Sequence, residues 1–372
     1  MTGAEMRTEG EGAPRGAAGR GGRRRTVTLS AVGCALAAAA GLLVPAAFDG
    51  QGDRQRDDTA SGKRAAAERF APRAATTASC DHPEQSLRPT GEAGPAMQRL
   101  KKRQDKKLRV GVDLNSFKWG YRDPTRDDKI AGFDIDLARA IAKEVYGEEG
   151  ETEEEKEKHV TFIAIPTSQR TKALATRRVD VIVRTMTITC ERAEEVAFSA
   201  PYFETYQQLL VPKEAEGAGG AEDSPATSYG PSLKGKTVCA ANRTTAQAVL
   251  DDPAKGTEKL GAKQLIVPNQ LDCLVRLQLG EVDAILTDGA LAASQAAQDP
   301  TLELVEEKVS PEPEYYGVAV NKDDTDLVRT VNKVLEDYSR GGERSLWMQK
   351  YQYWLQEQLP KITGPPAVQY RD

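Results

Sequence analysis

The sequence predicts an α/β protein of two similar lobes built on mostly parallel sheets. Patterns of buried strands alternate with helical patterns from about Lys106 onward, which is typical of a parallel sheet. A Val-Asp pair that leads into an apolar run occurs twice, at 179–183 and at 282–286, so the two halves resemble each other. The length of 372 residues is enough for about two domains.

The composition excludes several classes of function. With 51 Lys and Arg against 56 Asp and Glu, the net charge of −5 argues against nucleic-acid binding as the main activity. The charged fraction of 29% is too high for a multi-pass membrane protein, and the apolar fraction of 39% suits a globular core. His82 and His159 are the only histidines, so a His-rich metal site and most His-based catalysis are disfavoured. We expect no metal and no cofactor.

The N-terminus reads as a targeting segment. Residues 1–25 carry six Arg and three acids and are expected to be a basic cytoplasmic arm. Residues 26–48 carry no charge, and their length suits either one spanning helix or a signal peptide. Small residues around Ala46 would permit cleavage, so a retained anchor and a cleaved signal both stay open. Cys34 lies inside this run and reads as a buried thiol rather than a lipid-attachment site.

Residues 49–105, which include Cys80, are expected to form a flexible tether. Residues 49–77 are rich in Arg, Asp, Ala, Gly and Ser and have too few large apolar side chains to form a core. The folded part then begins near Lys106, and residues 361–372 form a C-terminal tail.

The first half predicts three strands and two helices. The strands are expected at 108–112, 160–165 and 179–183. A helix opens at Gly132, with apolar residues at a helical period as far as Val145, and a second helix covers 168–176. The charge run at 148–158 is expected to be a solvated loop.

The second half repeats this alternation. Strands are expected at 237–240, 284–286 and 316–320, with a turn at 242–245 that leads into a helix. An amphipathic helix at 326–338 and a last helix marked by Trp347 and Trp354 complete the chain. The segment 214–231 is rich in Ala, Gly, Ser and Pro and reads as a surface loop.

Four cysteines follow the apolar segment, and an even number in an exported chain favours disulfides. Three pairings are possible. Cys239 and Cys273 lie in one segment, so we pair them, which leaves Cys80 with Cys190. Free buried thiols are the alternative, and the absence of any Cys-x-x-Cys pattern argues against zinc.

Ligands of open α/β sheets bind at the carboxyl ends of the strands. In this chain those ends carry the run 185–192 in the first lobe and Asp288 in the second. Arg192 offers a two-pronged donor for a carboxylate, and Asp288 offers an acceptor for an ammonium group. One fixed cation and one fixed anion across a cleft suit an amino acid. The alternative is that both residues belong to structural or surface ion pairs.

The motifs resemble the polar-amino-acid branch of the extracellular (family 3) solute-binding proteins, which are the binding subunits of ABC importers. The resemblance covers about Leu108 to Leu355, and it looks closest to glutamate-type binding proteins of high-GC Gram-positive bacteria (actinobacteria), which also carry the positions of Cys239 and Cys273. Seven motifs occur in the order found in the family: LRVGV at 108–112, GFDIDLA at 132–138, TITCER at 187–192, FSAPYF at 198–203, LKGKTV at 233–238, GEVDA at 280–284 and YGVAV at 316–320.

The resemblance implies a two-lobed periplasmic-binding-protein-like fold (type II) with two hinge strands. Lobe 1 would comprise 106–204 and 318–360, and lobe 2 would comprise 205–317. The hinges are expected near 204–206 and 313–317.

The resemblance also implies a role for each site residue. Arg192 would bind the ligand α-carboxylate with the help of Thr187, Thr244 and Thr245. Asp288 would bind the α-ammonium group, and Thr185 would offer a polar or carbonyl contact. Arg170 falls where acidic-amino-acid binders use Arg for the side-chain carboxylate, which favours glutamate or aspartate over glutamine; an Arg170 that faces solvent is the alternative.

Three features depart from the family pattern. Arg184 replaces a small or apolar residue, so it would either crowd the site or add a second cation. Arg243 replaces a Gly of the second-lobe turn. The aromatic side chain expected over the ligand is not clearly placed, with Phe117, Trp119 and Tyr121 as candidates.

The expected function is an extracytoplasmic substrate-binding protein, not an enzyme, that captures an acidic or polar amino acid and delivers it to an ABC transporter permease. We expect a monomer on the outer face of the cytoplasmic membrane, anchored or secreted, with membrane contact only through its N-terminal segment. A membrane-anchored amino-acid sensor is the alternative. Catalysis is disfavoured because no acid beyond Asp288 is clearly assigned to the cleft.

Overall fold

The computed structural model describes residues 80–126, 129–147, 152, 157–214 and 224–372, all of which belong to one unit that spans Ala74–Asp372. The expected cytoplasmic arm, the apolar segment 26–48 and the first part of the tether lie outside the described residues. Among the residues described, no helix is both long and apolar enough to cross a membrane.

Lobe 1 is built on the sheet β5-β1-β6-β13-β7. Strand β1 (Leu108–Val112) pairs in parallel with β5 (Val160–Ala164) and β6 (Val181–Ile182). Strand β13 (Glu314–Asn321) runs antiparallel to β6 and to β7 (Val196–Thr205). The sheet is therefore mixed, because β13, which returns the chain from lobe 2, runs against the other four strands.

Helices cover both faces of this sheet. Apolar side chains of α2 (Phe133–Tyr146), α10 (Thr325–Ser339) and α11 (Leu346–Trp354) form the larger core on one face, and α4 (Arg170–Ala175) packs on the other. The remaining short elements of lobe 1 are β2 (Asn115–Ser116), β3 (Gly120–Asp123), β4 (Lys129–Ala131), α5 (Cys190–Glu195) and the 3-10 turns η1 (Pro124–Arg126), η2 (Glu157–His159), η3 (Thr167–Gln169) and η5 (Gly342–Arg344).

Lobe 2 repeats the plan with the sheet β10-β9-β11-β8-β12. Its parallel strands are β10 (Lys263–Val267), β9 (Thr237–Ala241) and β11 (Ala284–Asp288), and β8 (Gln207–Pro212) and β12 (Leu302–Leu304) are antiparallel. Side chains alternate along each strand, so one face packs on α6 (Thr245–Asp251) and the other on α8 (Gln270–Gln278) and α9 (Gly289–Ala296). The short helix η4 (Pro231–Leu233) precedes β9 in the chain, and helix α7 (Thr257–Leu260) lies between α6 and β10.

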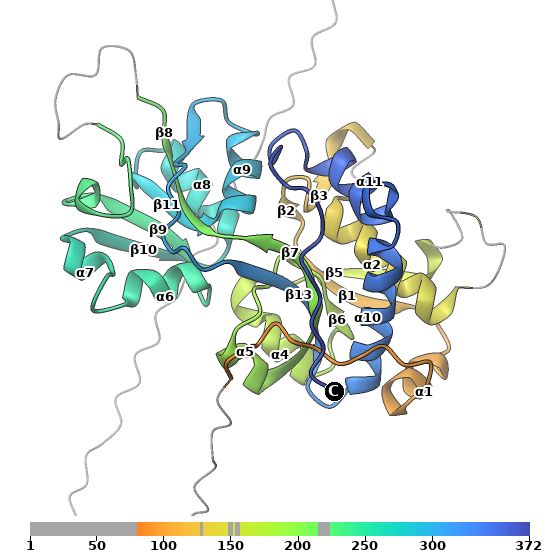
Figure 1. Ribbon diagram of the computed structural model, residues 1–372. Helices are drawn as coiled ribbons and strands as arrows, with labels where there is room; N and C mark the ends of the chain where they lie inside the picture. Colours follow the sequence, from red (N-terminus) through yellow and green to blue (C-terminus); the bar gives the residue numbers. More distant parts are fainter. Residues whose placement is uncertain (1–79, 127–128, 148–151, 153–156, 215–223) are drawn as a thin grey trace, which may run out of the picture. The chain divides into compact units, whose positions relative to one another are not determined.

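Two segments connect the lobes. The chain leaves β7 at Thr205, passes Tyr206 and enters β8 of lobe 2, and it returns just before Glu314 at the start of β13. Figure 1 shows β7 and β13 running between the two lobes. Glu314 pairs with Thr205, so both crossings lie side by side, at the positions where hinges are expected.

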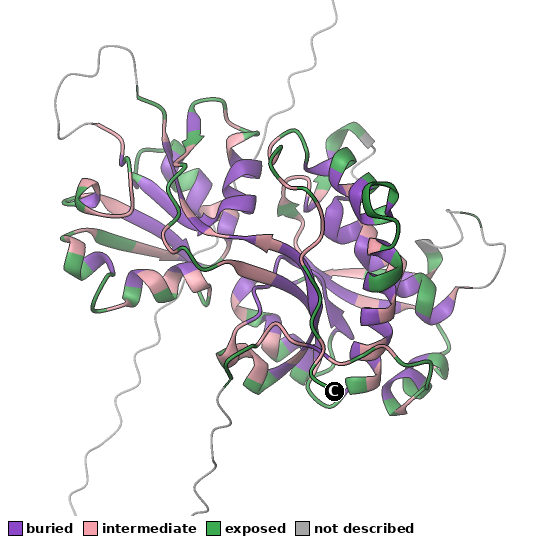
Figure 2. Ribbon diagram, viewed as in Figure 1, coloured by how far each residue is buried: buried purple, intermediate pink, exposed green. Residues whose placement is uncertain are grey.

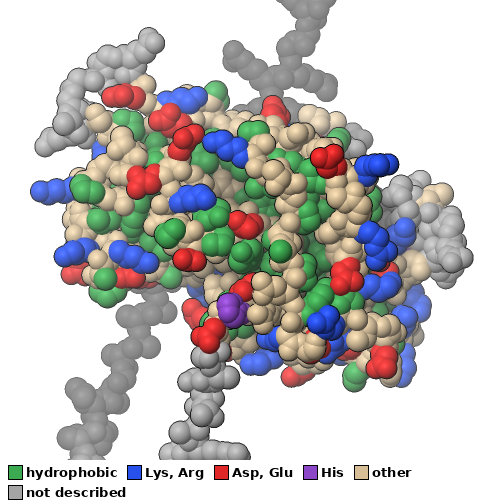
Figure 3. Space-filling view, viewed as in Figure 1, with side chains coloured by type: hydrophobic (Ala, Val, Ile, Leu, Met, Phe, Trp, Pro, Cys, Tyr) green, Lys and Arg blue, Asp and Glu red, His purple; other side chains and the backbone are tan. Residues whose placement is uncertain are grey.

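Burial follows this layout, with buried residues along the strands and exposed ones on the outer helix surfaces (Figure 2). The lobe 1 core contains a cluster of edge-to-face aromatic rings in which Trp119 contacts Phe133, Phe203 and Tyr316 at centroid distances of 4.8 to 5.7 Å. Charges of both signs are interspersed over the face drawn in Figure 3, which accords with the near-balanced composition.

Residues 80–105 differ from the expected tether. They contain helix α1 (Pro95–Lys101), whose buried Ala96, Met97 and Leu100 belong to the lobe 1 core. Arg103 forms a two-pronged ion pair with Asp180 at 2.7 and 2.8 Å. Three buried apolar side chains and one partly buried ion pair therefore fix this segment to lobe 1, although its composition suggests a flexible tether.

The C-terminal tail also packs back on this segment. Tyr370 forms a backbone bridge with Ser86, and Arg88 donates to the side chain and the main-chain oxygen of Asp372 at 2.7 and 2.6 Å. The structure thus ties the start of the described chain to its end.

Two disulfides join the cysteines as the sequence predicts. Cys239 on β9 is bonded to Cys273 on α8 in the core of lobe 2, and Cys80 is bonded to Cys190, the first residue of α5. The Cα–Cα distance is 5.7 Å in both. The first bond fixes a helix to the strand beside it, and the second fixes the start of the described chain to lobe 1.

Candidate functional site

The candidate site lies where the carboxyl ends of β6 and β11 face each other. Two adjoining cavities there share the lining residues Thr167, Arg170, Arg192, Thr244 and Thr245. All seven residues expected in the binding site line the inner cavity, namely Arg170, Thr185, Thr187, Arg192, Thr244, Thr245 and Asp288. Both lobes therefore contribute to one polar cleft.

Arg192 lies in the first turn of α5, whose N-cap Thr189 accepts a hydrogen bond from the Arg192 backbone N–H at 3.2 Å. Its Nη1 donates to the backbone oxygen of Thr187 at 2.7 Å, and its Nη2 donates to that of Arg243 in lobe 2 at 3.1 Å. Burial lowers the pKa of Arg192, and the nearby carboxylates of Glu314 and Asp288 partly offset that effect. The guanidinium stays a cation at the junction of the lobes.

Arg170 begins α4, and only 5% of its surface is exposed. Its Nε donates to the backbone oxygen of Thr167 at 3.1 Å, and no carboxylate of the described residues lies within ion-pair distance of its guanidinium. Burial lowers its pKa well below the usual value, and Arg192 and Arg184 lower it further. The reading of Arg170 as a solvent-facing residue does not hold, since it is buried and lines both cavities.

Asp288 ends β11 and is 7% exposed. One carboxylate oxygen accepts from the Gln207 amide at 2.7 Å and the other from the Tyr316 hydroxyl at 2.6 Å. Burial raises the pKa of Asp288, and the negative charge of Glu314 raises it further. A cation beside this carboxylate would counter both effects.

Glu314 borders the cleft through hydrogen bonds to two of its lining residues, and the sequence reading missed it. It begins β13, and one of its oxygens accepts from the hydroxyls of Thr187 and Thr245, both at 3.0 Å. The other oxygen accepts from the Gln207 amide at 3.1 Å. No local sequence signal marks Glu314, because a Glu at the start of a strand is common. Only the pairing of β13 in the sheet brings Glu314 close to Thr187.

Thr185, three residues after the end of β6, has a left-handed backbone with φ of 40°. Its N–H donates to Asp134 and to the Tyr202 hydroxyl at 3.0 and 3.1 Å, and Tyr202 donates to Asp134 at 2.9 Å. Burial raises the pKa of Asp134 to about 7. This buried network holds the turn that presents 185–187 to the cleft.

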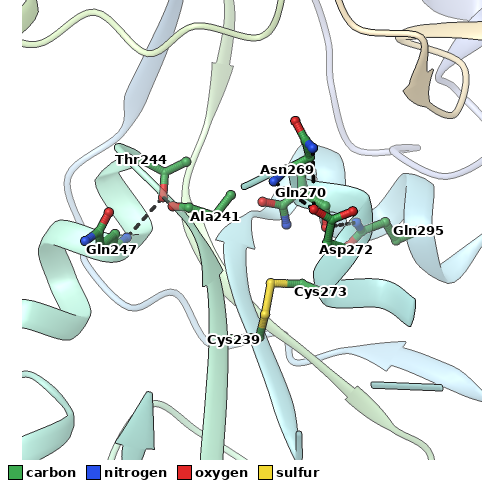
Figure 4. The surroundings of a disulfide bond; sticks show 9 residues. All are labelled: Cys239, Ala241, Thr244, Gln247, Asn269, Gln270, Asp272, Cys273 and Gln295. Carbon is green, nitrogen blue, oxygen red and sulfur yellow. Dashed lines mark hydrogen bonds between the residues drawn. A yellow bond between two sulfur atoms is a disulfide. The ribbon is translucent and has the colours of Figure 1, made fainter. Parts of the chain in front are cut away.

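Thr244 and Thr245 lie at the start of α6 in lobe 2. The Thr244 hydroxyl caps the helix by accepting from the Gln247 N–H at 3.1 Å, and it donates to the Ala241 oxygen at 2.7 Å (Figure 4). Arg243, which replaces the usual Gly, takes a left-handed φ of 59° that a glycine would adopt more readily. Its backbone oxygen still reaches Arg192, as described above.

Helix α8 brings one further polar group to the cleft. Its capping box joins Asn269 to Asp272, and Cys273 ties the same turn to β9 (Figure 4). Gln270, the first residue of the helix, lines the inner cavity and is 8% exposed, and its Nε2 has no hydrogen-bond partner.

The remaining departures from the family pattern are also placed. Arg184 is 4% exposed and forms an ion pair with Asp113 at 2.6 Å, so its charge is already compensated. Trp119 is fully buried in the lobe 1 core and donates to the Ser294 hydroxyl at 3.0 Å. Phe117 and Tyr121 contact each other edge to face, and neither lines the two cavities.

Known proteins with similar sequences bind amino acids. A glutamine-binding protein of a Bacillus subtilis ABC transporter is 31% identical over 68% of this chain and 82% of its own length. A glutamate-binding protein of Corynebacterium efficiens is 27% identical over 61% of this chain and 72% of its own length. Among solved structures, an ancestral arginine-binding protein bound to arginine matches with a TM-score of 0.56 and 31% identity, covering 68% of this chain and all of that one.

The family model of the bacterial extracellular solute-binding proteins, family 3, matches residues 108–354. These relatives are solute-binding proteins of amino-acid transporters and not enzymes. No group of metal-binding side chains occurs within the described ranges. With a two-lobed fold, a polar cleft at the strand ends and a family match over most of its length, the chain belongs to family 3 of the bacterial extracellular solute-binding proteins.

Proposed function

We propose that this protein binds glutamate in the cleft between its lobes and delivers it to an ABC transporter permease. Arg192, Thr187, Thr244 and Thr245 would bind the α-carboxylate, and the Thr187 and Thr245 hydroxyls would turn to it from Glu314. Asp288 would bind the α-ammonium group. Thr185 would contribute a polar contact. Because the ligand would contact both lobes, binding would stabilise the arrangement in which they meet.

Arg170 is the observation that carries the preference for glutamate. A buried guanidinium without a carboxylate partner is costly, and a ligand carboxylate beside it would remove that cost. A glutamine amide could accept a hydrogen bond from Arg170 but would leave its charge uncompensated. A ligand guanidinium would be repelled, which disfavours arginine.

The cellular setting follows from the family rather than from the cleft. Family 3 proteins are extracellular, so we place this chain outside the cytoplasmic membrane, where it would act as a monomer attached or exported through residues 26–48. A permease of an amino-acid importer would then be its partner.

Calorimetry and thermal unfolding of the full chain with each of the twenty amino acids would test the proposal. We expect glutamate to give the largest stabilisation. Arg170→Ala should weaken glutamate by about tenfold more than glutamine, because a charged hydrogen-bond partner is lost only for the carboxylate. Arg178→Ala, which removes an exposed Arg from the turn after the same helix, is the matched control and should change neither affinity. Equal losses for both ligands would refute the preference for glutamate.

A further inference from the structure

We propose that Glu314 is a second acidic residue of the amino-acid site, and that Glu314 and Asp288 together bind the ligand α-ammonium group. This inference rests on the proposed amino-acid binding and adds a residue to it. It does not depend on which amino acid is bound, since all of them carry the same ammonium group.

The position of Glu314 is the first argument. It is the first residue of β13, where the chain re-enters lobe 1. Its carboxylate accepts from Thr187 of lobe 1 and from Thr245 of lobe 2, each at 3.0 Å, and both Thr residues line the inner cavity. Glu314 itself lines neither cavity in this structure, so its carboxylate borders the cleft through these two hydroxyl groups and contacts both lobes.

The second argument is the distance between the two acids. The Gln207 Nε2 atom donates to Asp288 at 2.7 Å and to Glu314 at 3.1 Å, so the two carboxylates flank a single amide group. Asp288 is buried and Glu314 is partly buried, so the two like charges repel each other, and the negative charge of Glu314 contributes to the raised pKa of Asp288. A cation bound between the two acids would relieve the repulsion.

No side chain of the described residues supplies that cation. Neither Asp288 nor Glu314 forms an ion pair with a Lys or Arg in the described ranges. The nearest guanidinium, that of Arg192, donates to backbone oxygens of Thr187 and Arg243 instead. The two carboxylates thus form a site that calls for a positive charge from outside the chain.

Gln207 gives an independent indication of a missing donor. Its side chain reaches between the two acids and is 3% exposed, yet its Oε1 has no hydrogen-bond partner. Turning the amide over would point that oxygen at two carboxylates, so the orientation is fixed by its neighbours. A buried acceptor of this kind is normally satisfied. The Gln207 Nε2 already lies between the two acids, so an α-ammonium group, which has three N–H donors, would take over the contacts that this amide makes with both carboxylates.

The consequence is a site that selects for a free ammonium group. Glutarate, which has both carboxylates of glutamate but no amine, should bind far more weakly than glutamate, because it would leave the acidic pair without a cation. N-acetylglutamate should fail for the same reason.

Calorimetry on the full chain with Glu314→Gln would test the assignment, using whichever of the twenty amino acids gives the largest thermal shift with the wild type. We expect the affinity to fall by about tenfold or more, because a charged hydrogen-bond acceptor is removed. Glu314→Asp, which keeps the charge, should bind more tightly than Glu314→Gln. Glu312→Gln, which neutralises an exposed acid two residues earlier, should bind as the wild type does.

Two results would overturn the assignment. One is an unchanged or higher affinity of Glu314→Gln, which would make Glu314 a structural acceptor or a competitor of the ligand carboxylate. The other comes from a crystal structure of the wild type with the bound amino acid, in which the ammonium nitrogen lies more than about 4 Å from Glu314; this measurement remains decisive if the variant does not fold. Wild-type protein that binds no amino acid would refute the proposed function itself, which is a distinct outcome.

Discussion

The two faces of the cleft carry opposite charges. Lobe 1 presents the guanidinium groups of Arg170 and Arg192, neither of which forms an ion pair with a described carboxylate. Lobe 2 and the returning hinge strand present Asp288 and Glu314, which have no Lys or Arg partner in the described ranges. Arg184, by contrast, is neutralised within lobe 1 by Asp113. A molecule with charges of both signs can satisfy both faces at once, and a molecule of one charge cannot.

Breaking the cationic face should have the largest effect. Arg192→Ala removes the cation proposed for the α-carboxylate, and loss of one partner of a buried charge pair costs about 3 to 5 kcal/mol, so the affinity should fall more than a hundredfold. Calorimetry with glutamate measures this. Arg178→Ala is the control, since Arg178 is exposed and lines neither cavity. If Arg192→Ala bound glutamate as tightly as the wild type does, Arg192 would not bind the ligand α-carboxylate.

Breaking the acidic face should have a smaller effect. Asp288→Asn keeps the shape and an acceptor for Gln207 but removes the negative charge, so we expect the affinity for glutamate to fall by about ten- to a hundredfold. The loss is smaller than for Arg192→Ala because Glu314 would still face the ammonium group. Glu303→Gln, an exposed site on lobe 2, serves as the control in the same calorimetric series. Equal losses for Asp288→Asn and Arg192→Ala would show that the acidic face has no second member.

Asp134 lies behind the cleft, so its substitution should alter the stability of the fold rather than the affinity for the ligand. Asp134 has a pKa of about 7, raised by burial from 3.8. A carboxyl with a raised pKa in the folded state stabilises the fold most at low pH, and this contribution is lost as the pH rises from about 4 to about 7. Asp134→Asn does not titrate, so its stability relative to the wild type should increase over that range.

Urea unfolding of both proteins between pH 4 and pH 8 would measure this difference, and parallel profiles would contradict it. The affinity for glutamate should change less than about threefold, because Asp134 contacts the turn at Thr185 and not the cleft. A large loss of affinity would place Asp134 among the residues that position the ligand.

The sequence was most informative where function depends on local chemistry. The runs that end β6 and β11 carry an Arg and an Asp beside hydroxyl groups, and the structure places these residues on one cavity. The burial of Arg170 could not be predicted, because it depends on how α4 packs against the sheet and not on the helix itself. Glu314 was missed because its partners Thr187 and Thr245 lie far away in the chain and meet it only across β13.

Two structural elements also escaped the sequence reading for physical reasons. Residues 179–183 read as one strand, but β6 is only Val181–Ile182. At its start the Asp180 side chain, rather than a backbone oxygen, accepts from the Arg109 N–H. Helix α1 has only three buried apolar residues, too few to signal a helix within a polar segment. Both depend on contacts with distant residues that a local pattern does not contain.

The bond between Cys80 and Cys190 has a mechanical consequence. Cys190 begins the helix that carries Arg192, so the chain that precedes Cys80 is fastened to the cation-bearing half, two residues from its guanidinium. Lobe 2 is joined covalently to that half by the two crossing segments, and its other contacts with that half, such as those of Arg243 and Ser294, are hydrogen bonds. Any attachment upstream of Cys80 would therefore act on lobe 1 alone. Lobe 2 could then move relative to lobe 1 without pulling on that attachment.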